Sequence, residues 1–328
     1  KTFEETKVPV EIKDDDGPIV EPSFKAWWGV PDMPKINFES KEARQWALDV
    51  TKYWIENFNI DGWRMDVAKE LDFSFWKEFR DIAHGANKDT LLISEIFGDT
   101  SQWLQGDRFD GTMNYSFRES MTDYFATKRI TNKEFADSLA NLYSMYSFEA
   151  LSSCQNLLSS HDVKRFLNRC GNEKDGMLGA IFLQATFPGI AGIYYGDEIG
   201  LGGADDPFNR EPFPWDDEKS WNLEILNYLK NLMKIKRESP IFKYGRFELL
   251  NEHNDFVAFR RILKDESMLC IINREKSNND FQIISNAHSI NLKFGECTAN
   301  LDDGKIKITN NSGDIGPVSY THLTLPTT

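Results

Sequence analysis

Positive charge is in short supply in this sequence. It contains 38 lysines and arginines against 52 aspartates and glutamates, which gives a formal net charge of −14. No basic stripe offsets the acidic excess. Because nucleic acids and anionic membrane surfaces are bound through clustered cations, we expect neither as a partner. An acidic surface remains compatible with neutral ligands such as sugars.

Long apolar runs and paired cysteines are also missing. No segment approaches the roughly 18 apolar residues of a membrane-spanning helix. The four cysteines, Cys154, Cys170, Cys270 and Cys297, form neither a CxxC pair nor a zinc-type spacing. We interpret them as plain thiols, which favours a reducing, cytoplasmic compartment, although four cysteines could also form two disulfides.

Neither end has the features of a complete protein. The chain begins at Lys1 without an initiator Met or a signal peptide, so we expect a fragment whose upstream part is not included. The last residues, 318–328, carry no charged side chain and resemble the translation of a sequencing-library adapter. We predict that they are a non-native tail and leave them out of the predicted fold.

Strand-like apolar runs alternate with amphipathic segments through residues 1–240. Five such units are present, whereas a closed (β/α)8 barrel has eight. The predicted fold class is therefore α/β, a partial TIM barrel with about strands four to eight of the closed form. Helices are predicted at 41–58, 72–86, 132–147, 174–187 and 219–238, and strands at 60–67, 90–97, 109–115, 153–160 and 189–195.

The pattern changes after Pro240. Short runs rich in β-branched and aromatic residues follow one another without helical spacing, for example at 256–262 and 268–272. Such runs, separated by turn residues, are typical of antiparallel strands. We predict an antiparallel β-sandwich domain at 241–317.

Three acidic residues stand where predicted strands end, namely Asp66, Glu95 and Asp162. In barrels of this type the catalytic groups lie at the C-terminal ends of the strands, and paired carboxylates cleave glycosidic bonds. Arg64 lies on the same strand face as Asp66 and favours its ionised form. The apolar neighbours of Glu95 favour the protonated form that a general acid needs. Taken singly, each acid could instead be a helix cap, a turn former or an ion-pair partner.

Several segments together carry a family resemblance. Asp61-Gly-Trp-Arg-Met-Asp-Val-Ala68, Ile93-Ser-Glu95 and Leu158-Ser-Ser-His-Asp162 resemble three signature regions of the alpha-amylase family, glycoside hydrolase family 13. Met33-Pro-Lys-Ile-Asn37 resembles the additional signature of its neopullulanase, cyclomaltodextrinase and maltogenic amylase group. The resemblance extends over about residues 20–317.

The resemblance implies a role for each acid. Asp66 would be the nucleophile, Glu95 the general acid/base, and Asp162 the carboxylate that binds sugar hydroxyls in the transition state. The implied reaction is retaining hydrolysis of alpha-1,4-glucosidic bonds in maltooligosaccharides, cyclodextrins, pullulan or starch. A 4-alpha-glucanotransferase with the same residues, or a non-catalytic glucan-binding relative, stays open as an alternative.

Further expectations follow from the same resemblance. The expected substrate contacts beyond the three acids are Arg64, His161, Lys69, Phe97, Asp206 and Arg210. Lys69 stands where many members have Asn, so the acceptor side of the site is expected to differ. The expected hydrolysis requires no cofactor, and we expect none of these site residues to bind a metal ion. The acidic run Asp14–Asp16 could bind a structural calcium ion, although a solvated loop is the simpler interpretation.

The missing upstream part carries expectations of its own. By resemblance, an N-terminal domain absent from this chain would form a homodimer. We expect the chain as given to be inactive alone, because a barrel open between strands exposes edges and core.

Overall fold

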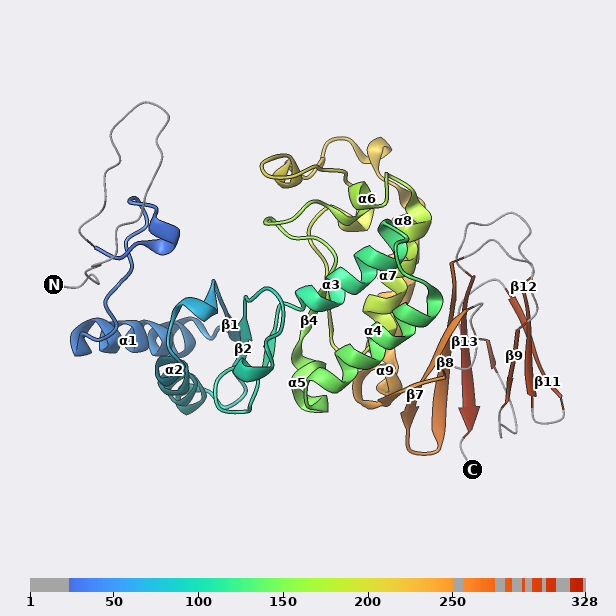
Figure 1. Cartoon of the computed structure of the whole chain (residues 1–328), viewed down its shortest axis with the longest axis horizontal. Coiled ribbons are helices and arrows are strands. Elements are labelled where there is room, and N and C mark those ends of the chain that lie inside the picture. The colour runs from blue at the N-terminus through green and yellow to red at the C-terminus, as the bar shows by residue number, and fades with distance from the viewer. Residues whose placement is uncertain are drawn as a thin grey trace. The chain divides into compact units, whose positions relative to one another are not determined.

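The computed structural model describes residues 24–250, 256–274, 281–284, 291–292, 297–302, 305–310 and 319–326. The chain divides into two compact units, which are described one at a time (Figure 1). The first unit contains Lys1–Leu92 and Gln105–Phe109, and the second contains Ile93–Leu104 and Asp110–Thr328.

The described part of the first unit holds two α-helices and the strands beside them. Its elements are α1 (Lys41–Phe58), β1 (Gly62–Met65), α2 (Phe73–Ala86), the start of β2 (Leu91–Ser94), and the short 3-10 helices η1 (Trp27–Gly29) and η2 (Ala68–Glu70). The side chain of Ser40 accepts a hydrogen bond at the start of α1, and Asp72 does the same for α2. Helices predicted at 41–58 and 72–86 are therefore confirmed almost to the residue.

An aromatic core joins β1 to α2 in this unit. Trp76 and Phe79 of α2 are buried, and the ring of Trp63 in β1 meets Phe79 with 6.5 Å between centroids. The indole N–H of Trp76 donates to the carbonyl of Ala68 over 2.8 Å. The face of β1 opposite Arg64 thus packs on α2, as the alternation of side chains along a strand predicts.

Parallel strands follow one another in chain order through the second unit. The end of β2 pairs with β3 (Gly111–Thr112), and β4 (Gln155–Leu157) pairs with β5 (Ile190–Gly192). A parallel bridge between Met113 and Gln155 connects β3 to β4. In the first unit, the backbone N–H of Leu91 donates to the carbonyl of Asp61 just before β1. Strands are therefore present in all five predicted regions.

Further helices of the described residues belong to the second unit, which also has short 3-10 helices. They are α3 (Tyr115–Met121), the π-helix η4 (Thr122–Ala126), α4 (Asn132–Met145), α5 (Phe148–Ser153), α6 (Phe166–Arg169), α7 (Lys174–Thr186), α8 (Leu223–Glu238) and α9 (Pro240–Tyr244). The predictions at 132–147, 174–187 and 219–238 are confirmed, with shifted ends. The strand predicted at 109–115 is shorter, because the side chain of Asn114 caps a helix that begins at Tyr115.

The described residues after Pro240 include two antiparallel sheets. One has the order β10-β13-β8-β7-β6 and the other β11-β12-β9. Their strands are β6 (Arg246–Leu249), β7 (Val257–Leu263), β8 (Glu266–Asn273), β9 (Phe281–Ile284), β10 (Asn291–Leu292), β11 (Cys297–Asp302), β12 (Lys305–Asn310) and β13 (Ser319–Pro326). The change to antiparallel strands after Pro240 is confirmed.

One strand lies where the sequence analysis assigned none. β13 falls within the tail at 318–328, and it pairs with β8 along its whole length, from Ser319 opposite Asn273 to Pro326 opposite Glu266. Its tyrosine and threonines are residue types that are enriched in strands. The fold therefore includes residues that we had set aside, while their non-native origin stays a prediction.

Two composition-based expectations can be compared with the described residues. No helix among them is both long and apolar enough to cross a bilayer. Cys154, Cys170 and Cys270 are free and buried, and burial raises the pKa of Cys154 and Cys170 to about 12. These three are plain free thiols, as predicted, whereas the side chain of Cys297 lies outside the described residues.

Candidate active site

Asp66 directly follows β1, as predicted. Its Oδ1 accepts a hydrogen bond from Nη1 of Arg64 over 2.6 Å, and its side chain is 72% exposed. The guanidinium holds one oxygen of this carboxylate, and the exposed carboxylate remains accessible to a ligand. The predicted pair of Arg64 with Asp66 is therefore confirmed.

The backbone just after Asp66 is strained. Val67 has φ 42° and ψ 46°, in the left-handed region that β-branched residues rarely adopt. Its carbonyl accepts from the N–H of Glu70 and starts η2. Strain of this kind costs on the order of 1–3 kcal/mol and concentrates at functional sites. It turns the chain sharply after the carboxylate, so Asp66 stands at the rim of β1.

A cavity of about 540 Å³ opens beside Asp66 within the first unit. Lys35 crosses one side of it, with Nζ 3.2 Å from Oε2 of Glu70 and 3.3 Å from the Glu70 carbonyl. Lys69 is exposed and, like Glu70, belongs to the short helix η2. The cavity is lined by Trp27, Met33, Pro34, Lys35, Ile36, Phe38, Asp66, Val67, Glu70 and Leu71.

Glu95 directly follows β2 and belongs to the second unit. It is 6% exposed, and the neighbouring Ile96 is 4% exposed. The carbonyl of Ser94, just before it, accepts from the N–H of Met113 over 2.8 Å and from the hydroxyl of Thr112 over 3.0 Å. The burial predicted for Glu95 is confirmed, and the backbone just before it is anchored to β3.

His161 and Asp162 lie on the loop that follows β4. Nε2 of His161 is 3.1 Å from Oδ2 of Asp162, and Nη2 of Arg210 is 3.8 Å from Oδ1. Nε of Arg210 is 2.7 Å from Oδ1 of Asp206 and donates to the His161 carbonyl over 3.1 Å. Four residues that were predicted separately thus form one polar cluster. A carboxylate between two such donors is suited to gripping sugar hydroxyls.

Phe97 reaches this cluster through a stack. Its ring lies on Tyr115 with 3.8 Å between centroids and 19° between planes, and 51% of Phe97 is exposed. The hydroxyl of Tyr115 is 3.3 Å from Oγ of Ser160, which in turn accepts from the N–H of Asp162 over 3.2 Å. An exposed aromatic face with a fixed orientation suits the predicted role as a platform for an apolar sugar face.

Sequence reasoning missed a buried ion pair beneath the same loop. Nη1 of Arg165 donates to the Tyr195 carbonyl over 2.7 Å and lies 3.3 Å from Oδ1 of Asp197. Burial raises the pKa of Asp197 to about 7, although a hydrogen bond with Ser159 and the charge of Arg165 act in the opposite direction. Arg165 follows the predicted site by three residues, but nothing local to it shows that its partner is Asp197.

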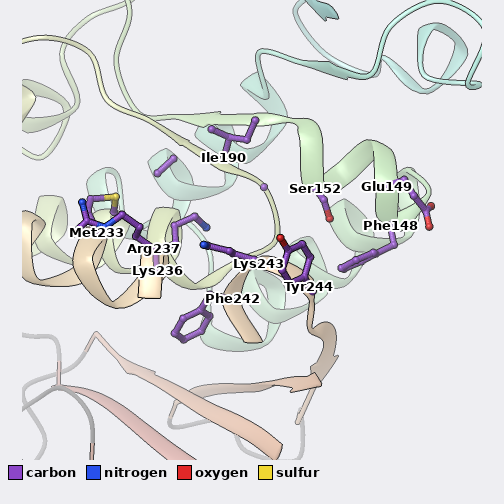
Figure 2. Close-up of a pocket in the computed structure, with 12 residues that line it drawn as sticks. Phe148, Glu149, Ser152, Ile190, Met233, Lys236, Arg237, Phe242, Lys243 and Tyr244 are labelled. Atoms are coloured by element: carbon purple, nitrogen blue, oxygen red, sulfur yellow. The ribbon is translucent and has the colours of Figure 1, made fainter. Parts of the chain in front are cut away.

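A larger cavity, of about 690 Å³, lies at the other ends of the strands (Figure 2). It touches Ile190, the first residue of β5, and Ser152, which precedes β4. Lys236 of α8 and Tyr244 of α9 close it on the helical side. None of the predicted site residues lines it. Catalytic groups of parallel barrels lie at the C-terminal strand ends, so this cavity is not the candidate site.

The metal prediction is not reached by the structure. Asp14–Asp16, the proposed calcium ligands, lie outside the described residues. Among the described residues, no group of three or more His, Cys, Asp or Glu side chains is arranged to hold a metal ion.

The predicted residues fall into two groups, one in each unit. Arg64, Asp66 and Lys69 belong to the first unit, whereas Glu95, Phe97, His161, Asp162, Asp206 and Arg210 belong to the second. Within each unit the contacts above hold. The convergence of all three acids on one substrate remains a prediction from the sequence.

Comparison with known proteins bears on the whole pattern. A family model described as "Alpha amylase, catalytic domain" matches residues 23–239. Neopullulanase 2 of Thermoactinomyces vulgaris is 39% identical over 246 residues, covering 74% of this chain and 42% of the relative. A cyclomaltodextrinase of Thermoanaerobacter pseudethanolicus is 38% identical over 253 residues, covering 77% of this chain and 44% of the relative. The chain spans less than half the length of these relatives.

Solved structures of related enzymes resemble this chain in fold. A Nostoc punctiforme debranching enzyme has a TM-score of 0.85 at 28% identity, covering 99% of this chain and 69% of its own. A cyclomaltodextrinase has a TM-score of 0.86 at 28% identity, covering 98% of this chain and 54% of its own.

Proposed function

Because this chain belongs to the alpha-amylase family, we propose that it supplies the catalytic acids of a retaining alpha-glucan hydrolase. The observation that carries the proposal is the contrast between two strand-end carboxylates. Asp66 is exposed and held by Arg64, whereas Glu95 is buried. This difference in exposure between two strand-end carboxylates matches the different roles of a nucleophile and a general acid.

The proposed architecture is the C-terminal part of a (β/α)8 barrel followed by a β-sandwich. Parallel strands that neighbour each other in chain order, each preceded or followed by helices, support it. In such a barrel the ends of β1 and β2 face the same rim as the loop after β4. That arrangement would direct Asp66, Glu95 and Asp162 to one substrate.

The proposed reaction proceeds in two displacements. Glu95 donates its proton to the glycosidic oxygen while a carboxylate oxygen of Asp66 bonds to the anomeric carbon, and the leaving sugar departs with the proton. Glu95, now ionised, takes a proton from water, and the hydroxyl replaces Asp66 at the anomeric carbon. Retention by this route requires the two carboxyl groups to lie about 5–5.5 Å apart.

Asp162 and its neighbours would hold the reacting sugar. The His161 and Arg210 side chains orient the Asp162 carboxylate, which could then accept hydrogen bonds from sugar hydroxyls that strengthen in the transition state. The proposed substrates are maltooligosaccharides, cyclodextrins, pullulan or starch. The names of the relatives, a cyclomaltodextrinase and a neopullulanase, support this class.

Substitution of the two acids tests the proposal. In the full-length protein, Asp66→Asn and Glu95→Gln should each lower kcat on cyclodextrin and maltotriose by several orders of magnitude, since each removes a group that the chemistry uses directly. Glu149→Gln is the matched control, because Glu149 lines the cavity at the opposite strand ends and should keep normal turnover. Near-normal kcat in either acid variant would remove the assignment.

Product analysis separates hydrolysis from transfer. Water as the second acceptor gives free reducing sugar in proportion to bonds cleaved, whereas transfer to a sugar gives longer oligosaccharides without a matching rise in reducing ends. We expect hydrolysis products to dominate at low substrate concentration. A product pattern made mainly of elongated chains would favour the glucanotransferase.

A further inference from the structure

Asn209 meets three carbonyls of one turn with a single amide group. It lies in the 3-10 helix η6 (Phe208–Arg210) and is completely buried. Its Nδ2 donates to the carbonyl oxygens of Ser160, His161 and Val163 over 3.3, 2.9 and 3.0 Å. An amide nitrogen carries two hydrogens, so at least one of them is shared between carbonyls.

The turn that Asn209 holds has little other support from its own backbone. Ser160 and Val163 form an isolated antiparallel bridge, and the N–H of Val163 reaches the Ser160 carbonyl only at 3.4 Å. Buried carbonyls without a donor cost on the order of 1–3 kcal/mol. Arg210 Nε also donates to the His161 carbonyl and the Val163 N–H to the Ser160 carbonyl, so the Asn209 amide reinforces these two acceptors and supplies a donor to the Val163 carbonyl. Because three carbonyl oxygens surround one terminal atom of the Asn209 amide, that atom is its nitrogen.

The same turn carries Asp162. Its backbone N–H donates to Oγ of Ser160, and its carboxylate lies between His161 and Arg210. Arg210 is the residue after Asn209, so η6 supports both the backbone and the carboxylate side of the turn. A shift in Asn209 would therefore move Asp162 relative to any bound sugar.

Asn209 is itself firmly seated. The hydroxyl of Tyr194 donates to its carbonyl over 3.3 Å. Gly203 passes so close that a Cβ placed there would lie 2.6 Å from the Phe208 carbonyl oxygen and 2.9 Å from Cα of Asn209. The backbone N–H of Arg165 donates to the Gly203 carbonyl, which joins this loop back to the segment after the turn.

We propose that Asn209 is a positioning residue that fixes the Ser160–Val163 turn and, through it, the orientation of Asp162. The proposal rests on the proposed function, in which Asp162 holds the reacting sugar. Asn209 acts on the backbone alone and needs no contact with substrate.

A double-mutant cycle in the full-length protein tests the coupling. Asn209→Asp keeps the size of the side chain but places carboxylate oxygens against the three carbonyl oxygens. We expect this variant to lower kcat on maltotriose by on the order of 10- to 100-fold, because small misplacements of a catalytic group have effects of this size. Asp162→Asn sets the reference loss. If Asn209 acts through Asp162, the double variant should be little worse than Asp162→Asn, whereas independent effects multiply. Multiplying effects, or unchanged kcat in Asn209→Asp, would overturn the proposal.

Phe208→Ala is the matched control from the same short helix. Phe208 is 61% exposed, so its removal should leave kcat and the melting temperature close to those of the parent. If Asn209→Asp does not accumulate as folded protein, the cycle is run with Asn209→Ser, which is neutral and too short to reach all three carbonyls.

Hydrogen exchange separates failure of this inference from failure of the proposed function. Amides of a peptide covering residues 158–166 should exchange faster in Asn209→Asp than in the parent or in Phe208→Ala. Unchanged exchange there would overturn the positioning role whether or not the protein cleaves glucans. A parent protein that cleaves no alpha-glucan, but shows the faster exchange in the variant, would overturn only the proposed function.

Discussion

Asp197 is a buried carboxylate that lies against an equally buried cation. It is 4% exposed, and Arg165 is completely buried between it and the rings of Tyr194 and Tyr195. Burial disfavours the charged carboxylate more than Arg165 and Ser159 favour it, which raises its pKa to about 7. The folded protein thus holds a proton that the unfolded chain releases near the ordinary value of 3.8.

This linkage predicts a pH dependence with a definite sign. Because the folded pKa is the higher one, the stability from this proton is present below about pH 4 and is lost as pH rises towards 7. Asn cannot titrate, so Asp197→Asn should gain free energy of unfolding relative to the parent between pH 4.5 and pH 7, with a plateau above. Urea unfolding of both proteins across this range measures the difference. A gap that stays constant would mean that Arg165 keeps Asp197 ionised throughout.

Residues differ in how much of their role the sequence reveals. Asp66 and Glu95 were found because each ends an apolar run, and their surroundings follow from near neighbours such as Arg64 and Ile96. Asn209 carries no such signal, since its partners lie more than 40 positions earlier in the chain. Only the fold brings its amide to the turn that carries Asp162.

At the scale of elements, β3 is held by close backbone approach. A Cβ on Gly111 would lie 2.1 Å from the Ser153 carbonyl oxygen and 2.4 Å from the carbonyl carbon. Both atoms are backbone atoms of the last residue of α5, so the end of that helix would have to move. The short strand therefore depends on glycine for space.

A pair of glycine substitutions tests this dependence. Gly111→Ala should destabilise the protein by at least about 1–3 kcal/mol, as overpacking does. Gly85→Ala, in α2, meets nothing within 4 Å and should be neutral or stabilising by up to about 1 kcal/mol, since alanine is the better helix former. Thermal unfolding of both variants gives the comparison. Equal melting temperatures for the two would contradict the close approach at β3.

Helices were predicted better than strands for a physical reason. An amphipathic period and a capping side chain such as Asp72 are local, so the bounds of α1 and α2 follow from the sequence. The parallel strands β1 to β5 are only two to four residues long. Such short strands contain too few residues for an alternating pattern to be recognised in the sequence. Asn114 ended the strand early by capping α3, which the apolar run had concealed.

At the scale of the whole molecule, β13 occupies an interior position in its sheet. It lies between β10 and β8, so its removal would leave the long strand β8 with an unpaired edge. Exposed edges reduce stability and invite pairing with other chains. The structure thus gives residues 319–326 a part in the fold that their composition did not suggest.

Truncation tests that part. A protein ending before Ser319 should unfold at a lower temperature and aggregate more readily than the longer chain, measured by thermal unfolding and light scattering side by side. Replacing residues 319–326 with a Gly/Ser segment of equal length is the control for chain length and should behave like the truncation. Unchanged stability in both would show that β13 contributes nothing and would support the prediction of a foreign tail.

The sequence by itself determined the five longer helices, the alternation of these helices with strands, the change to antiparallel strands, and the strand-end positions of Asp66 and Glu95, whereas the shorter helices α3, α5, α6 and α9 were not predicted. These depend on spacing and on near neighbours, which a linear chain displays directly. Only the tertiary structure decided that Arg210 joins His161 and Asp162, that Asp197 faces Arg165, and that the Asn209 amide holds the Ser160–Val163 turn. Such contacts join residues far apart in the chain, because a buried polar group takes whichever partner the packing brings to it.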